Sequence, residues 1–208
     1  MHPPSTPLPP TPAAQGFGPD TTERLPLPER SAMTAAQQAA ADALIAGPRK
    51  AVFGPFVPLL QTPLLMERVG KVGEALRFDG GLPARIRELV ICAVARETSN
   101  QFEWQTHAPL ATQAGVAPTT VQALAEGRCP RNLPADEASA LDFAAELVRR
   151  HGVSDTTHAE AQRHFGSPGV VELTTLVGYF VMVCWVMNVA RTPGNAATGT
   201  PALTAFPA

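Results

Sequence analysis

Residues 82–115, LPARIRELVICAVARETSNQFEWQTHAPLATQAG, decide how this chain folds. After Pro83, apolar residues recur at close to the three- and four-residue spacing of a helix with one core-facing side. Residues 98–100 interrupt that pattern, and a second helix is predicted over residues 101–114, ended by Gly115. Two helices joined by so short a break are expected to pack side by side and antiparallel.

Glu103 and His107 are four residues apart in the second of these helices, so their side chains are predicted to be neighbours on one face. Glu88, on the preceding helix, is about as far from the break as His107, and we expect all three groups to converge. A carboxylate beside an imidazole can transfer protons near neutral pH. Glu88, Glu103 and His107 are therefore the candidate catalytic residues.

Simpler roles exist for the same residues. Asn100 and Glu103 have the spacing of a helix N-terminal cap, in which Glu103 would reach back toward its own helix start. Glu88 could form a surface ion pair with Arg85, one turn earlier. Two donors, Glu103 and His107, make a weak case for a metal, so no metal site is expected.

The rest of the chain predicts an all-α domain. Residues 1–30 hold many of the 22 prolines and are expected to form an extended or disordered arm, whereas residues 194–208 look like a tail. Between them, residues 31–193 show start and stop signals for about eight helices and no strand-like alternation. The boundary between the last two helices is expected at residues 165–167, and the apolar loop 48–61 should pack on the core or on a partner.

Composition excludes several classes of partner. A net charge of −2 and sparse aromatic residues give no footprint for nucleic acid or an anionic membrane. The long apolar run at residues 173–190 is read as a buried helix, because it contains threonines and Asn188 and has no basic flank on its N-terminal side. Three widely spaced cysteines and no readable secretory signal predict a cytoplasmic protein.

Three blocks of sequence carry a resemblance to a known family. RIREL at residues 85–89 and FEWQTHAPLA at residues 102–111 resemble the carboxymuconolactone decarboxylase family, which shares its fold with alkylhydroperoxidase-like proteins. Residues 151–188 look like the second part of a longer-chain branch of that family. The resemblance spans roughly residues 24–193 and implies an alkylhydroperoxidase-like helical bundle.

The resemblance also separates two activities. In the peroxidase members the pattern is E-x11-C-x2-C-x3-H, and here Glu88 matches the relay acid and His107 the relay histidine. Asn100 and Glu103 stand where the two cysteines would be, so this pattern lacks the thiols that reduce a peroxide. Cys92, on the preceding helix, is the thiol that a remaining peroxidase activity would use.

The resemblance therefore implies a cofactor-free acid–base enzyme that decarboxylates a small lactone or carboxylated ring compound in catabolism. Arg85 could hold the substrate carboxylate. Trp104 is a second candidate substrate-binding residue, although a helical tryptophan is more often part of the core. Similar proteins assemble as trimers or hexamers, which implies a homo-oligomer with residues 53–60 as a plausible contact surface. The alternatives are a peroxidase and a non-catalytic oligomeric binding protein.

Overall fold

The computed structural model describes residues 22–205, and every regular element in that range is a helix, which confirms the predicted all-α class. The helices are, in chain order, α1 (Ala35–Ala46), α2 (Phe56–Leu59), α3 (Pro63–Glu74), α4 (Ala84–Glu97), α5 (Gln101–Gln113), α6 (Pro118–Ala125), α7 (Ala135–Arg150) and α8 (Asp155–Ala190). Three short turns of other helix types accompany them: η1 (Arg30–Ala32), η2 (Ala75–Asp79) and η3 (Ala196–Thr198).

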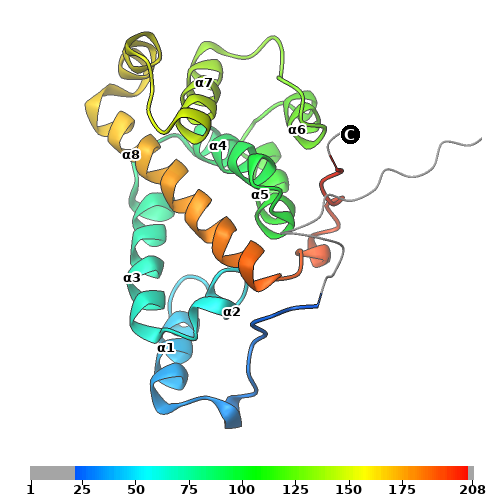
Figure 1. Cartoon of the computed structure of the whole chain (residues 1–208). Coiled ribbons are helices and arrows are strands. Elements are labelled where there is room, and N and C mark those ends of the chain that lie inside the picture. Colours follow the sequence, from blue (N-terminus) through cyan, green and yellow to red (C-terminus); the bar gives the residue numbers. More distant parts are fainter. Residues whose placement is uncertain (1–21, 206–208) are drawn as a thin grey trace, which may run out of the picture.

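Helix α4 is the centre of the bundle and packs against α5, α7 and α8 (Figure 1). Four consecutive residues, from Leu89 to Cys92, are completely buried, so α4 is covered on every side over this turn. Ser99 takes a left-handed conformation with φ of 49°, which turns the chain sharply enough for α5 to return along α4. The predicted antiparallel pair is therefore present.

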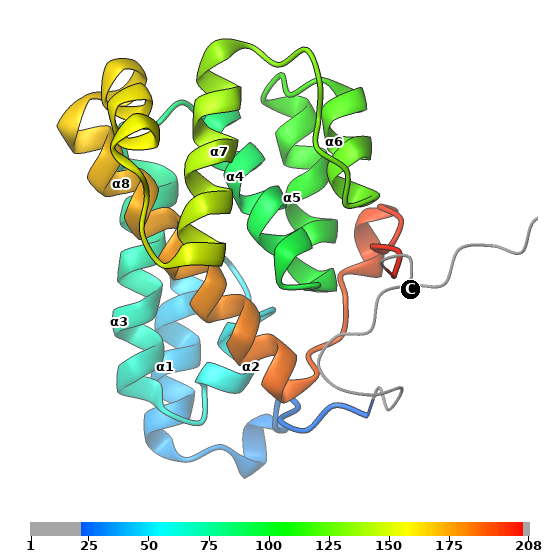
Figure 2. The same cartoon turned by 45° about the horizontal axis from the view of Figure 1, so that its top comes forward.

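Helix α8 crosses the molecule between α1–α3 on one side and α4–α7 on the other (Figures 1 and 2). Gly166 interrupts it with φ of 65° and ψ of 176°, a conformation that favours glycine. The break lies where the sequence predicted the boundary between two helices. The helix is long and apolar enough to cross a membrane, but half of its most apolar window is buried inside this protein, as in a core helix.

The apolar segment between α1 and α3 packs on the chain's own core. Phe56, Val57 and Leu59 on α2 are buried together with Leu60. The prediction that residues 53–60 form a contact surface for another subunit therefore does not fit this structure, because these side chains already fill the core. Phe53 is the large apolar residue of this segment that stays exposed.

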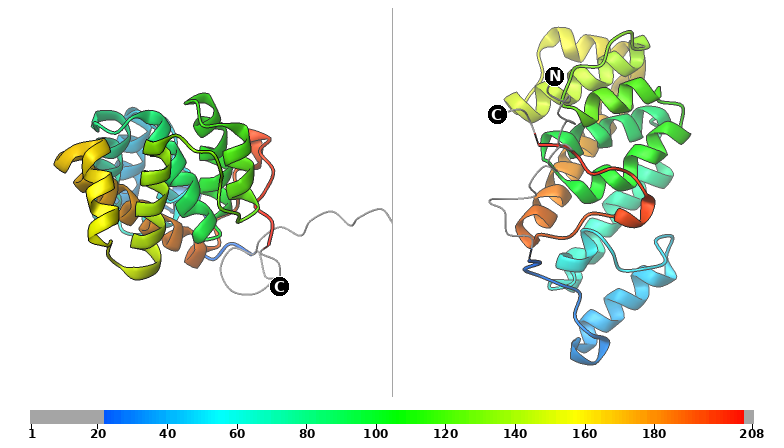
Figure 3. Two further views of the ribbon diagram at one scale, coloured as in Figure 1. Left: turned by 90° about the horizontal axis from the view of Figure 1, so that it is seen from above. Right: turned by 90° about the vertical axis from the view of Figure 1, so that its right-hand side faces the viewer.

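The segment after α8, predicted to be a tail, lies along α5 beside the green helices in Figures 2 and 3. Gln101 binds the backbone of Leu203 twice, through its side-chain oxygen at 2.7 Å and its nitrogen at 3.1 Å. Trp104 donates its indole N–H to the carbonyl of Pro201 at 3.1 Å. At the other end of the chain, the Arg24 N–H bonds the Ala190 carbonyl at 2.8 Å, while residues 1–21 of the predicted arm lie outside the described residues.

Candidate functional site

Glu88, His107 and Glu103 form one continuous chain of acidic and basic groups. The Nδ1 atom of His107 lies 2.6 Å from Oε2 of Glu88, and its Nε2 atom lies 3.2 Å from Oε2 of Glu103. The prediction that the three groups converge is confirmed in these distances. The antiparallel packing of α4 and α5 brings Glu88 to His107, and the four-residue helical spacing within α5 brings Glu103 there.

The cap at the start of α5 positions Glu103 without using its side chain. The side-chain oxygen of Asn100 accepts a hydrogen bond from the Glu103 backbone N–H at 2.9 Å. Its side-chain nitrogen donates to Asn188 at 2.8 Å, which fixes this end of α5 against α8. The Glu103 carboxylate is thus directed to His107 and does not return to the helix start, so the cap and the acid–base pair coexist.

The three side chains are buried, with Glu88, Glu103 and His107 exposed by 5%, 4% and 2% respectively. Burial by itself lowers the pKa of His107, but the hydrogen bonds and charges of Glu103 and Glu88 outweigh it, and the pKa is raised above its ordinary value. Burial raises the pKa of Glu88, but His107, with help from Arg77 and Arg87, brings it below the ordinary value. The two carboxylates therefore favour the cationic form of the imidazole, which suits an acid.

A small cavity opens at one end of this chain of groups. Its volume is about 30 Å³, enough for a water molecule. Glu103 and His107 line it, but Glu88 does not. Glu103 is therefore the end of the relay that a ligand can reach, and Glu88 is the buried end. The ring of Phe180 meets His107 edge-on, with centroids 5.4 Å apart, and closes the apolar side of the cavity.

Reasoning from the sequence did not find Arg49, Arg77 and Tyr179, which lie among the polar residues of this cavity. Arg49 precedes α2, Arg77 lies in η2 and Tyr179 is on α8, so no local spacing relates them to His107. Tyr179 did carry a signal, because it is the only tyrosine and sits in a long apolar run. A phenol buried in such a run needs a polar partner, and here that partner is the Arg49 guanidinium.

The two predicted substrate-binding residues lie elsewhere. Arg85 points to α7, where it forms ion pairs with Asp136 and Glu137. Trp104 is buried in a separate apolar cluster with Leu89 and Leu203, as the simpler interpretation of a helical tryptophan expected. Neither residue lines the cavity at His107. The structure therefore does not bring Arg85 or Trp104 together with Glu88, Glu103 and His107.

The cysteines near this cavity are poor nucleophiles. Cys92 is completely buried, and burial together with the negative charges of Glu88 and Glu103 raises the pKa of its thiol. Burial likewise raises the pKa of Cys184. Within residues 22–205, no group of three or more histidine, cysteine or acidic side chains is arranged to hold a metal ion.

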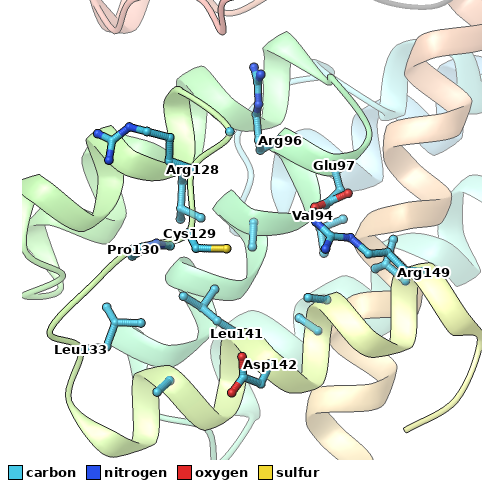
Figure 4. Close-up of a pocket in the computed structure, with 17 residues that line it drawn as sticks. Val94, Arg96, Glu97, Arg128, Cys129, Pro130, Leu133, Leu141, Asp142 and Arg149 are labelled. Carbon is cyan, nitrogen blue, oxygen red and sulfur yellow. Dashed lines mark hydrogen bonds and ion pairs between the residues drawn. The ribbon is translucent and has the colours of Figure 1, made fainter. Parts of the chain in front are cut away.

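A second, more spacious cavity of about 330 Å³ lies against α4 and α7 (Figure 4). Its lining is mainly apolar, including Val94, Leu133 and Leu141, and the exposed Cys129 faces it. Among its charged residues, Arg149 and Glu97 form an ion pair with each other. Its volume exceeds that of the cavity at His107, but the paired acid and base groups lie at the smaller one, and they decide our choice.

Comparisons with known proteins agree with this geometry. Residues 63–146 match the model of the carboxymuconolactone decarboxylase family, a segment that contains Glu88, Glu103 and His107. No curated protein matches the chain.

Two solved structures show the same fold. One is an uncharacterized peroxidase-related protein with an alkylhydroperoxidase AhpD core from Ralstonia eutropha JMP134, with a TM-score of 0.70, 18% identity and coverage of 85% of this chain and 94% of that one. The other is an uncharacterized peroxidase-related protein from Silicibacter sp. TM1040, with a TM-score of 0.69, 16% identity and coverage of 88% and 96%. Residues 63–146 thus resemble the carboxymuconolactone decarboxylase family, and the chain has the alkylhydroperoxidase-like helical fold.

Proposed function

We propose that this protein is a cofactor-free acid–base enzyme of the decarboxylase type that acts on a small lactone or carboxylated ring compound. The observation that carries the proposal is the buried cationic imidazole of His107 between two carboxylates, of which Glu103 faces a cavity. Such an arrangement stores a proton next to a site from which water is largely excluded.

The proposed reaction needs two events. The bond between the substrate ring and its carboxylate carbon breaks, carbon dioxide leaves, and the electron pair remains on the conjugated lactone as a dienolate. A proton then adds to a ring carbon. In our proposal the His107 cation passes its proton to the Glu103 carboxylate, Glu103 delivers it to the ring carbon, and Glu88 holds the imidazole in the correct orientation. A proton from solvent restores the starting state.

Two alternatives have specific support. The solved structures of the same fold are described as peroxidase-related, which favours a peroxidase, although the thiol pair of that pattern is replaced by Asn100 and Glu103. The small volume of the cavity favours a non-catalytic binding protein, because a ring compound does not fit unless the exposed side chain of Phe53 moves.

A direct assay separates these functions. We expect the purified protein to release carbon dioxide from at least one member of a panel of carboxylated lactones, and to consume hydrogen peroxide or an organic hydroperoxide no faster than a Cys92→Ser variant does. Rapid peroxide consumption that Cys92→Ser abolishes would establish the peroxidase instead. Neither activity across the panel would favour the binding protein.

We also propose that the protein is a cytoplasmic homo-oligomer. The outer face of α8 presents a stripe of exposed apolar side chains at a seven-residue repeat, formed by Val171, Met182, Trp185 and Val189. Gly178 lies within the same stripe and leaves open space for a close approach. A repeat of this kind is typical of helix–helix contact, so a second copy of α8 is the partner that fits it.

Replacing Trp185 by glutamate is therefore expected to reduce the oligomer to monomers, because a charge would be buried at the centre of the contact. Size-exclusion chromatography with light scattering measures the mass. His158→Glu, which adds the same charge at an exposed position of α8, should leave the mass unchanged. A monomeric wild-type protein, or a Trp185→Glu variant with the wild-type mass, would contradict the proposal.

A further inference from the structure

We infer that Arg77, Arg49 and Tyr179 form a binding subsite for one carboxylate group of a flat, unsaturated ligand. The role of this subsite in decarboxylation rests on the proposed function, whereas the binding of a carboxylate does not. All three residues line the cavity that Glu103 and His107 also line, so the bound carboxylate would lie beside the relay.

Arg77 supplies an unsatisfied donor. Its Nε atom is buried and has no hydrogen-bond partner within residues 22–205, and no ion pair in that range includes its side chain. Leaving a buried guanidinium N–H unpaired costs free energy unless a ligand accepts from it. The residue lies in η2, a π-helical turn that continues α3, and turns of this kind are frequent at functional sites.

Arg49 and Tyr179 line the same cavity as Arg77 and supply the other polar groups of the subsite. The Arg49 side chain is only 4% exposed and is held by the Glu74 carboxylate at 2.8 Å and by the ring of Phe56, whose centroid is 4.6 Å away. Burial raises the pKa of Tyr179 to about 12, so its hydroxyl remains a donor at neutral pH. Gly73 makes this arrangement possible, because a Cβ atom there would lie 2.2 Å from the Tyr179 hydroxyl oxygen.

The charges indicate how many anionic groups the subsite accepts. Glu74 pairs with Arg49, and the two carboxylates of Glu88 and Glu103 are balanced by the two cations His107 and Arg87. The Arg77 charge has no such direct partner in the described part of the chain, so one carboxylate completes the site. The rings of Phe102 and Phe180 line the same cavity and offer apolar faces to a flat ligand body, which enters when the exposed side chain of Phe53 moves.

Benzoate and its neutral isostere benzamide test the inference without any turnover. We expect isothermal titration calorimetry to show that the wild-type protein binds benzoate at least tenfold more tightly than benzamide. Arg77→Gln should reduce benzoate affinity at least tenfold and leave benzamide affinity unchanged, and Tyr179→Phe should produce a smaller loss. Arg68→Gln is the control: it removes an exposed charge from α3, the helix that η2 continues, and should not change either affinity.

Equal affinities for benzoate and benzamide, no binding of benzoate to the wild-type protein, or unchanged benzoate affinity in both Arg77→Gln and Tyr179→Phe would overturn the subsite. Circular dichroism of each variant identifies any that fails to fold, and the remaining variant then decides. Benzoate binding through Arg77 in a protein that decarboxylates nothing would retain the subsite and refute the proposed function. If the protein decarboxylates a substrate and Arg77→Gln leaves the KM for that substrate unchanged, the proposed function would be retained and the subsite refuted.

Discussion

Replacing His107 by glutamine is expected to lower kcat for a carboxylated lactone by about 10²–10⁴-fold, the usual contribution of general acid–base catalysis. Glutamine approximates the size of the imidazole and can still donate a hydrogen bond to one glutamate, but it cannot carry a proton between Glu88 and Glu103. Single-turnover kinetics measures the chemical step directly, and KM should change much less than kcat.

His158→Gln is the matched control for this experiment, because it makes the same replacement at an exposed position of α8. It should retain wild-type kinetics. If His107→Gln retained them as well, His107 would be structural, and the non-catalytic binding protein would become the better proposal.

Replacing His107 by leucine is expected to reduce the free energy of unfolding by about 3–5 kcal/mol near pH 6, the typical cost of breaking a buried ion pair from one side. The side chain that separates the carboxylates of Glu88 and Glu103 would be apolar, and both carboxylates would remain buried without the imidazole cation. The destabilisation by His107→Leu should therefore exceed the destabilisation that altered packing alone would cause.

The loss of unfolding free energy caused by His107→Leu should become smaller both at higher pH and at lower pH. The pKa of His107 is raised in the folded protein, so its stabilisation is complete below the ordinary value of 6.5 and disappears as the pH rises through the folded value. The pKa of Glu88 is lowered, so its stabilisation is complete above the ordinary value of 4.5 and disappears as the pH falls through the folded value. The difference between wild type and His107→Leu is thus largest between those ordinary values.

Urea denaturation at three pH values, one within this window and one on each side of it, measures the difference. A destabilisation that is the same at all three would mean that only packing was lost, and that His107 is not held as a cation in the folded protein. The slope of the unfolding free energy against urea should stay constant, so that the midpoints report stability alone.

Local patterns were sufficient to predict much of the site. The break at residues 98–100 makes α4 and α5 antiparallel neighbours, and this alone brings Glu88 to the height of His107. The spacing of Glu103 and His107 within one helix brings Glu103 to the same imidazole, because side chains four residues apart in a helix share a face. The break at Gly166 was equally readable, since glycine and the following Ser-Pro dipeptide act on the backbone locally.

Other features depended on packing between distant segments. The C-terminal segment has few large apolar residues, yet it is ordered along α5 because the buried side chains of Gln101 and Trp104 require hydrogen-bond partners and its backbone provides them. The core position of α2 was ambiguous for a related reason: the sequence shows that Phe56 and Leu59 must be covered, but it does not specify what covers them.

By itself, the sequence determined the all-α class and the relay of Glu88, His107 and Glu103, because both follow from spacing within one helical hairpin. Only the tertiary structure decided what faces that relay. It directed Arg85 to α7 and placed Arg49, Arg77 and Tyr179 around the cavity. The physical reason is that a helix sequence specifies which side is buried, whereas the partner of a buried charge depends on how several helices pack together.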